Sequence, residues 1–590
     1  MIAPLHHYDV VIVGSGIGGL AAAKTYLEPS PNTNLILLEA RETLGGVWAK
    51  ENCYDGLKTN NIIGTYEFSD FPMDAKYGIK DGRHIPGFAM HQYLTDFARH
   101  YDIFRRIRFN VRVNEVHKSD NGGWDLMTVS TPGHETEETI IYHTEKLIMC
   151  TGLASRANPV NIKGVEDFGK PVLNHSQMTV EADLLARDTD AEVITVVGAS
   201  KTGYDAVHLF ASQGKGVDWI VRESGGGGVW MSLRWVLMGP WRVLLEPTAT
   251  MRFMSWFSPC IWGDFDGYGL LRRLLHGTWL GRLLVHKLWE KIRWDTVAVN
   301  RYRMDPCLAH LEPRECLFWS ARVGILNYPT DIHDYVRSGQ VKIYRKDISH
   351  LGSGTVNFVD GSRLRSDGLI AITGWRLVPG IKYTPEGIDA SLGIPSAKYN
   401  PVESEYWRHL DRSADREITQ RFPYLRNPPK AKLPFKQSVT PFRLYRGIAP
   451  PGLTVNQDQS LAFIKMVHST SNFIIAEAQA LWIYAYLNNK LPIERSQVFW
   501  NTALTSRFRK WRYPWGFSQW YPEFVYDAVP YADMLLSDLS LDRERKRRGK
   551  TGSLLREWFE GYTVHDYKGL NLEWKAQQLA SPGVQMADGL

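Results

Sequence analysis

The sequence predicts a doubly wound α/β fold with two Rossmann-like nucleotide-binding units and a helical, tryptophan-rich insertion. The first observation is a local pattern that occurs twice, as VIVGSGIGGLAA in residues 11–22 and as VVGASKTGYDA in residues 196–206. Each copy leads from an apolar strand through a glycine turn into a helix, which is the entry to a nucleotide-binding unit. The second observation is that eight of the 21 tryptophans lie between Trp230 and Trp294, in a segment with helical spacing. We expect that segment to be a separate helical module.

The composition limits the classes of protein and partner. The 590 residues are 44% hydrophobic and 22% charged, so we expect several packed domains. A net charge of +6 is small for this length, and the basic run RERKRRGK fits a solvated surface better than a nucleic-acid site. The five cysteines are scattered without a C-x-x-C motif, no apolar leader opens the chain, and no run of 18 apolar residues occurs. We therefore expect a cytoplasmic protein with no nucleic-acid partner, disulfide framework, metal site or spanning helix.

The first glycine turn is predicted to bind a dinucleotide. Gly14 permits a tight turn, Gly16 allows a pyrophosphate to approach the backbone, and Gly19 lets helix and strand pack closely. The start of the helix offers free N–H groups to the phosphates. The next strand ends in Glu39, 25 residues after Gly14, where a carboxylate can accept hydrogen bonds from a ribose diol. Strand, helix and acid together favour a nucleotide site over a merely structural turn.

The stretch EARETLGGVW, which begins at Glu39, resembles the flavin-containing monooxygenases and their Baeyer–Villiger relatives, the class B flavoprotein monooxygenases. In that family an E-x-R-x-x-x-G-G-x-W run wraps the FAD. Glu39, Arg41, Gly45, Gly46 and Trp48 match this run position for position. The resemblance implies FAD at the first turn, with Arg41, Gly46 and Trp48 among its contacts.

The second glycine turn repeats the first with two changes. Ser200 replaces the middle glycine, and the following strand ends in Arg222, 24 residues after Gly198, where the first unit has an acid. An acid suits a free 2′-hydroxyl and a base suits a 2′-phosphate, so the pattern predicts NADPH. The alternative is that Arg222 is a solvated strand end. The residues assigned to this site are Gly198, Ser200, Lys201, Thr202, Gly203 and Arg222.

Two strand ends, LIMCTG and GLIAITGW, resemble the A-T-G turns at which the chain of that family crosses between its FAD and NADPH domains. Cys150 and Ile372 replace the alanine, and both are apolar. The resemblance places Thr151 at the FAD site.

Two dinucleotides together permit hydride transfer from a nicotinamide to a flavin. A disulfide reductase would need a cysteine pair beside the flavin, and the FAD half has no closely spaced pair. The alternative is that the reduced flavin reacts with O2 to give a C4a-hydroperoxyflavin, which transfers one oxygen atom to a substrate.

The stretch YDGLKTNN bears on the kind of oxygen transfer. The Baeyer–Villiger relatives carry Arg and Asp where this chain has Lys58 and Asn60, whereas the flavin-containing monooxygenases carry Thr-Asn, which Thr59 and Asn60 match. A neutral amide can donate a hydrogen bond to a peroxide oxygen, so Asn60 is the candidate catalytic residue and Thr59 a cofactor contact. This favours hydroxylation over conversion of a ketone to an ester or lactone. Baeyer–Villiger oxidation and a non-catalytic redox-sensing flavoprotein stay open as alternatives, and Asn60 is alternatively only a turn residue.

The longest basic stretch of the insertion, GLLRRLLHGTWLGRLLVHKLWEKIRW, has helical spacing, with Leu280, Leu284, Leu288 and Ile292 on one face. A lid whose apolar face packs on the domains is the favoured interpretation. The alternative is peripheral contact of residues 270–294 with an intracellular membrane. The aromatic insertion indicates a bulky apolar organic substrate, oxidised with O2 in a biosynthetic pathway of secondary metabolism. The sequence leaves the oligomeric state open.

The predicted segments alternate between the two units. In order they are the first part of the FAD-binding domain (1–165), the first part of the NADPH-binding domain (166–225), the helical insertion or lid (226–295), the second part of the NADPH-binding domain (296–368), the closing part of the FAD-binding domain (369–500) and a C-terminal extension (501–590).

Overall fold

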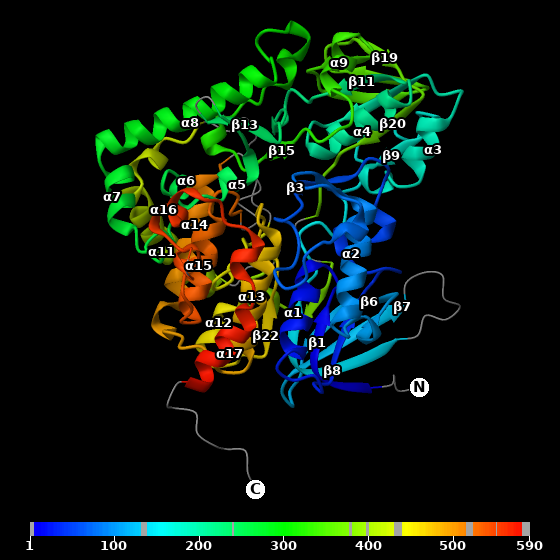
Figure 1. The fold of residues 1–590 in the computed structure, drawn as a ribbon. Coiled ribbons are helices and arrows are strands. Elements are labelled where there is room, and N and C mark those ends of the chain that lie inside the picture. Colours follow the sequence, from blue (N-terminus) through cyan, green and yellow to red (C-terminus); the bar gives the residue numbers. More distant parts are fainter. Residues whose placement is uncertain are drawn as a thin grey trace.

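A computed structural model describes most of the chain (Figure 1). The described residues are 5–130, 139–238, 241–376, 380–396, 401–429, 439–514, 523–549 and 551–580. Residues 1–4, at the start of the predicted FAD-binding domain, and residues 581–590, at the end of the predicted C-terminal extension, lie outside the described residues. In Figure 1 the first unit lies below in blue and the second unit lies above it at the right, with the green insertion at the upper left.

An eight-stranded sheet forms the core of the first unit. Its strands, in spatial order, are β21 (Lys382–Thr384), β6 (Val111–Lys118), β7 (Trp124–Ser130), β8 (Ile140–Met149), β1 (Leu5–Val13), β2 (Leu35–Leu38) and β5 (Ile107–Arg108), with β22 (Leu461–Phe463) also paired to β8. The continuous apolar run in β1 suits a strand that is covered on both faces. Val10, Val11 and Ile12 are accordingly at most 1% exposed.

The second unit is built on a five-stranded parallel sheet. Its strands, in spatial order, are β16 (Val341–Tyr344), β11 (Gly216–Ile220), β10 (Val193–Val197), β20 (Gly368–Ala371) and β9 (Val172–Asn174). Strands from both sides of the insertion therefore share one sheet. The three-stranded antiparallel sheet beside it consists of β17 (Ile348–Gly352), β18 (Thr355–Phe358) and β19 (Arg363–Arg365).

Each glycine turn leads into a helix that packs on its own sheet. These helices are α1 (Ile17–Leu27) and α4 (Lys201–Ser212). All 11 residues of α1 are buried, because α13 (Asn472–Leu487) covers the side that faces away from the sheet. The alanines of α1 allow this close double packing, since they present almost no side chain to either neighbour.

The insertion is a set of short strands followed by helices. Its elements are β12 (Trp230–Ser232), β13 (Trp235–Met238), β14 (Trp241–Leu244), α5 (Leu245–Ala249), α6 (Arg252–Trp256), α7 (Gly269–Gly277) and α8 (Trp279–Val299). Strand β12 pairs in parallel with β15 (Val323–Ile325), which ties the insertion back to the second unit. None of the described helices combines the length and apolar character needed to cross a bilayer.

The expected inner face of α8 is wrong for two of its four residues. Leu280 and Leu284 are 53% and 51% exposed, whereas Val285 and Trp289 are 4% and 7% exposed. A four-residue spacing overshoots one turn of 3.6 residues by about 40° at each step, so such a series does not stay on one face. The structure turns Val285 and Trp289 inward instead.

The C-terminal segment is helical and packs on the insertion. Its longer helices are α14 (Val498–Arg512), α15 (Ala528–Asp538), α16 (Leu554–Phe559) and α17 (Leu570–Ala580), and α11 (Pro401–Arg421) packs on α14.

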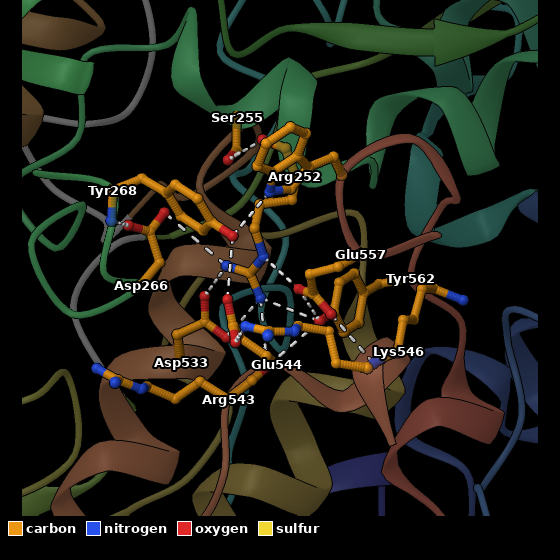
Figure 2. Close-up of polar contacts among 12 residues, drawn as sticks. Arg252, Ser255, Asp266, Tyr268, Asp533, Arg543, Glu544, Lys546, Glu557 and Tyr562 are labelled. Carbon is orange, nitrogen blue, oxygen red and sulfur yellow. Dashed lines mark hydrogen bonds and ion pairs between the residues drawn. The ribbon is translucent and has the colours of Figure 1, made fainter. Parts of the chain in front are cut away.

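A buried ionic network joins the insertion to these C-terminal helices (Figure 2). Arg252 of α6 contacts Asp533 of α15 through Nη1 at 2.5 Å and Glu557 of α16 through Nε at 2.5 Å. Its Nη2 donates to the hydroxyl of Tyr562 at 3.0 Å, and Asp266 lies 3.8 Å from Nη1. Arg252 and all three acids are fully buried. Since an unpaired buried charge is costly, these distant segments stabilise one another.

Candidate active site

The first glycine turn is closed so tightly that side chains cannot enter it. Gly14 has φ +105°, and a Cβ atom there would lie 2.4 Å from the carbonyl oxygen of Cys150. A Cβ atom on Gly19 would lie 2.1 Å from the carbonyl oxygen of Gly14. Only glycine therefore permits the strand, the turn and α1 to meet in this way.

The glycine pair at residues 45 and 46 folds back over this turn. A Cβ atom on Gly46 would lie 3.2 Å from Cα of Gly16, and the Gly45 amide donates to the carbonyl oxygen of Ser15 at 3.1 Å. Gly16 is the N-cap residue of α1 and has no side chain, so no capping side chain accepts hydrogen bonds from the first N–H groups of the helix. The result is a cradle of bare backbone at a helix N-terminus, which fits the pyrophosphate of FAD.

Glu39 ends β2 beside the same turn and is 6% exposed. Its carboxylate accepts from the amide and hydroxyl of Ser15 at 2.9 and 2.7 Å and from the Arg41 amide at 3.0 Å. The acid thus holds the turn in shape at the position predicted for ribose binding. Trp48 is buried and donates from Nε1 to the hydroxyl of Tyr66 at 3.3 Å.

Thr151 is the second residue after β8, and Cys150 between them seals the first turn. Ile372 does the same for the second turn, since a Cβ atom on Gly198 would lie 3.1 Å from the Ile372 Cβ atom. The two Thr-Gly segments of the sequence therefore occupy equivalent places in the two units.

The second glycine turn has the geometry of the first. Gly198 has φ +115° and donates to Ile220 O at 2.9 Å, as Gly14 donates to Leu38 O at 2.8 Å. A Cβ atom on Gly203 would lie 2.3 Å from the carbonyl oxygen of Gly198. This turn is the second candidate phosphate cradle.

The polar residues of the second turn differ in whether their side chains are free to contact a bound phosphate. Ser200 caps α4 with no side-chain hydrogen bond to the helix, and Thr202 beside it is half-buried. Lys201 is turned away, because its Nζ contacts Asp205 at 2.5 Å and the Tyr328 hydroxyl at 3.0 Å.

Arg222 is the second residue after β11 and is exposed. Its guanidinium makes no ion pair with any residue that the structure describes. It is therefore available to a 2′-phosphate bound at the second turn.

Strand β3 (Lys58–Ile62) carries the predicted catalytic residue. Thr59 is buried, and its hydroxyl donates to Asn61 O at 2.6 Å and accepts from the Ile85 amide at 2.9 Å. Asn60 points to the opposite side and is exposed, and its amide has no hydrogen bond to the described part of the chain. The Asn60 amide is free to contact a ligand, whereas the Thr59 hydroxyl already makes two hydrogen bonds within the protein.

The second unit contacts β3 directly. The side-chain amide of Asn327 donates to Thr59 O at 2.9 Å, and Lys58 Nζ donates to Asn327 O at 3.4 Å. The hydroxyl of Tyr54 donates to Asp205 at 2.8 Å. Desolvation, aided by Lys201, lowers the pKa of Lys58. The strand with Asn60 therefore depends on both units for its position.

Glu246 of α5 was not found from the sequence. Its carboxylate accepts from the side-chain amide of Asn61 and from the Ile62 amide at 2.9 Å. Asn61 also donates to Thr470 O at 3.0 Å, and burial raises the pKa of Glu246. The insertion thus places a carboxyl group against β3. No local motif marks Glu246, because it lies in the part of the chain that the family resemblance does not cover.

Lys465, just after β22, is a second residue that the sequence did not reveal. A Cβ atom on Gly18 would lie 2.8 Å from the Lys465 Cγ atom, so the lysine lies over the first turn of α1. Its Nζ donates to Asn472 at 2.7 Å, and desolvation lowers its pKa to about 8. A bound anion would raise this pKa again, which suits a phosphate site.

His468 lies three residues further on, 3.8 Å from Glu523. Its side chain is 55% exposed, yet protein atoms surround it closely enough that desolvation lowers its pKa to about 4. Desolvation also raises the pKa of Glu523 to about 8. These groups belong to segments far apart in the sequence, and no spacing pattern connects them.

Comparison with known proteins gives both sequence relatives and structural neighbours. A family model described as pyridine nucleotide-disulphide oxidoreductase matches residues 8–225. A protein named FAD-dependent monooxygenase from Pyrenophora dematioidea is 33% identical over 566 residues, which cover 92% of this chain and 99% of that protein. The FAD-dependent monooxygenase resA from Aspergillus sclerotiorum is 32% identical over 591 residues, which cover 97% and 99% of the two chains.

Among solved structures, the closed form of cyclohexanone monooxygenase has a TM-score of 0.57 at 14% identity, with 90% of this chain and 97% of that chain covered. At this identity the likeness concerns the fold alone. It confirms the predicted α/β architecture with two dinucleotide-binding units.

Proposed function

Because the chain belongs to the family of FAD-dependent monooxygenases, we propose that it uses NADPH and O2 to add one oxygen atom to a bulky apolar small molecule. The observation that carries the proposal is the pair of matching glycine turns, whose following strands end in opposite charges, Glu39 and Arg222. The FAD supplies the redox and oxygen chemistry, and NADPH supplies the hydride. The protein binds these groups, orients them and excludes water.

We assign the first turn to FAD and the second to NADPH. Gly14, Gly16, Gly19 and Gly46 form the backbone cradle of the first turn, and Glu39 accepts from a ribose. The other predicted contacts on the FAD side are Arg41, Trp48, Thr59 and Thr151.

At the second turn, Gly198 and Gly203 form the cradle, and Ser200 and Thr202 lie at the helix start. Arg222 pairs with the 2′-phosphate. Lys201 keeps its place in the proposal as a residue that must leave Asp205 before it can reach a phosphate.

Asn60 is proposed to act at the reacting centre, as a neutral donor that orients substrate or a developing oxyanion. Its exposed amide beside the buried, fixed Thr59 supports this role. We favour hydroxylation of a carbon or heteroatom. The second candidate is Baeyer–Villiger oxidation of a ketone, which a cation beside the flavin would assist, and Lys58 on the same strand is the residue that would supply it.

The insertion and the C-terminal helices are proposed to select the substrate. Glu246 of the insertion brings a carboxyl group to β3. His468, in the closing part of the first unit, lies 3.8 Å from Glu523 of the C-terminal extension. The aromatic composition of the insertion indicates a large apolar product of biosynthesis. We place the enzyme in the cytoplasm, with residues 270–294 in peripheral contact with a membrane. The segment boundaries after residues 165, 225, 295, 368 and 500 remain part of this proposal.

The test compares NADPH with NADH as reductant and then follows the oxygen atom. The purified holoenzyme is mixed anaerobically with each nucleotide, and the loss of flavin absorbance is timed. NADPH should reduce the flavin at least ~10-fold faster than NADH, because only NADPH carries the 2′-phosphate with which Arg222 would pair.

The second step uses a thioether and a cyclic ketone as probes under isotopically heavy O2. One heavy atom on sulfur supports the favoured reaction, and a labelled lactone supports the second candidate. Consumption of O2 that yields only hydrogen peroxide, unchanged by any apolar probe, would refute oxygen transfer.

A further inference from the structure

Helix α8 has an apolar side that the protein does not cover. Its inner side carries Gly281, Val285 and Trp289, and Trp289 donates from Nε1 to Phe257 O at 2.9 Å. Trp279, Leu280, Leu283 and Leu284, together with Leu270 and Leu274 of α7, form what we call the outer face. Their exposed fractions are Leu270 78%, Leu274 59%, Trp279 71%, Leu280 53%, Leu283 42% and Leu284 51%. Single exposed apolar residues are common, but six on two consecutive helices mark an interaction surface.

The two helices are close enough for these residues to act together. A Cβ atom on Gly281 would lie 2.3 Å from Leu274 O and 2.5 Å from Leu275 O, so the start of α8 packs directly on the end of α7. Thr278 caps α8 by accepting from the Gly281 amide at 3.0 Å, which fixes the turn between them. Figure 1 shows α7 and α8 at the outer edge of the molecule.

The charged residues of α7 and of the first half of α8 are all basic. The sequence has no Asp or Glu from residue 269 to residue 289. Arg273 and Lys287 are exposed, whereas Arg272 is buried and paired with Asp266 at 2.7 Å. The outer face therefore combines leucine and tryptophan side chains with cations that no acid of α7, or of α8 before residue 290, compensates.

We propose that the outer face docks on an anionic lipid surface, with α8 lying in the plane of the interface. Leucines enter the acyl boundary, tryptophan prefers the headgroup level, and long basic side chains reach the phosphates. A second copy of this chain is a poorer occupant, because a symmetric contact would bring Arg273 and Lys287 against the same cations of the partner. This docking rests on the membrane contact proposed above for residues 270–294 and makes it specific. It does not depend on oxygen transfer, whereas the supply of a lipid-dissolved substrate through it does.

Flotation of the full-length holoenzyme with vesicles tests the proposal without any turnover. One set of vesicles is phosphatidylcholine alone, and the other contains equal parts of phosphatidylcholine and phosphatidylserine. We expect the protein to float with the anionic vesicles and to be released by salt. The double variant Leu280→Gln, Leu284→Gln should lower the partition coefficient at least ~10-fold, because two apolar side chains are lost from the contact.

The matched control replaces two exposed leucines on α17, Leu572→Gln and Leu579→Gln, which are 68% and 81% exposed. This variant should float like the unchanged protein. The double variant Arg273→Gln, Lys287→Gln should lose the preference for anionic vesicles. The flavin spectrum and the melting temperature show that each variant is folded.

Failure of the unchanged protein to float would overturn the proposal, as would equal loss of binding in the α17 control. A dimer in solution that the Leu280→Gln, Leu284→Gln variant abolishes, without vesicle binding, would assign the outer face to a second copy instead. Since no substrate is present, none of these results depends on whether the enzyme transfers oxygen.

Discussion

Replacing Arg252 with methionine tests whether the insertion and the C-terminal helices are stabilised as one unit. The guanidinium contacts Asp533, Glu557, the Tyr562 hydroxyl and Arg543 O, and all of these contacts disappear in the variant. Methionine fills much of the volume but leaves two fully buried carboxyl groups without their cation.

The cost can be derived from the charges in the network. Arg252 and Arg272 face Asp266, Asp533 and Glu557, so two cations meet three acids even before the change. Removing one partner of a buried ion pair costs ~3–5 kcal/mol. Burial already raises the pKa of Asp533 to about 6, and protonation of this acid offsets part of the loss. We therefore expect about 3 kcal/mol at neutral pH, near the lower end of that range.

Native-state hydrogen exchange measures this cost where it arises. A loss of about 3 kcal/mol increases the local opening equilibrium roughly a hundredfold, so amide protection in α6, α15 and α16 should fall by that factor. The eight-stranded sheet should keep its protection. The control is Arg187→Met, since Arg187 is 62% exposed and, within the described part of the chain, pairs only with Asp183 one turn earlier. Unchanged protection in α6 and α16, or an equal loss throughout the first unit, would refute the reasoning.

Four further outcomes follow from the site and the network. Gly203→Ala places a Cβ atom 2.3 Å from Gly198 O, so NADPH should reduce the flavin at least ~10-fold more slowly while the FAD content stays unchanged, as timed by anaerobic rapid mixing. Arg222→Gln should raise the KM for NADPH about 10- to 100-fold and leave the KM for NADH unchanged in steady-state oxidation assays, because a charge-assisted contact is lost. Glu246→Ala should raise the share of O2 that is released as hydrogen peroxide, measured against product formed, because β3 loses a carboxylate that accepts two hydrogen bonds. In the folded protein the pKa of Asp533 is about 6, above its value in the unfolded chain, so the folded state holds this proton more tightly. The contribution of Asp533 to stability is therefore complete below about pH 4 and is lost as the pH rises through 6. Asp533→Asn should flatten the pH profile of the free energy of unfolding in that range.

The two glycine turns could be predicted because their geometry is local. The contact that requires glycine at residue 19 is with the carbonyl oxygen of Gly14, five residues earlier, and the second turn repeats this spacing. A sequence motif of a few residues is therefore enough to predict the geometry of the turn. Cys150 and Ile372, each directly before a Thr-Gly pair, close the two turns from far along the sequence, and only the family resemblance points to them. The predicted fold class and the family are both confirmed.

The rest depends on contacts that no local pattern records. Arg252 and Glu557 are 305 residues apart in the sequence, and Asn61 and Glu246 are 185 apart. The outer residues of α8 show the same limit in a helix, since spacing alone did not decide whether Leu280 faces the protein or the solvent. The roles assigned to Asn60 and Arg222 stay predictions, because each role is a contact with a bound ligand and not a contact within the protein.

Strand β3 is the place where the parts of the molecule meet. Asn327 of the second unit donates to Thr59 O from one side, and Glu246 of the insertion accepts from Asn61 and Ile62 from the other. A shift of the second unit when nucleotide binds, or of the insertion when it contacts another surface, therefore acts on the backbone on both sides of Asn60. In the proposed function, substrate selection and oxygen transfer both involve this strand, so changes in the insertion should alter the yield of the reaction as well as its choice of substrate.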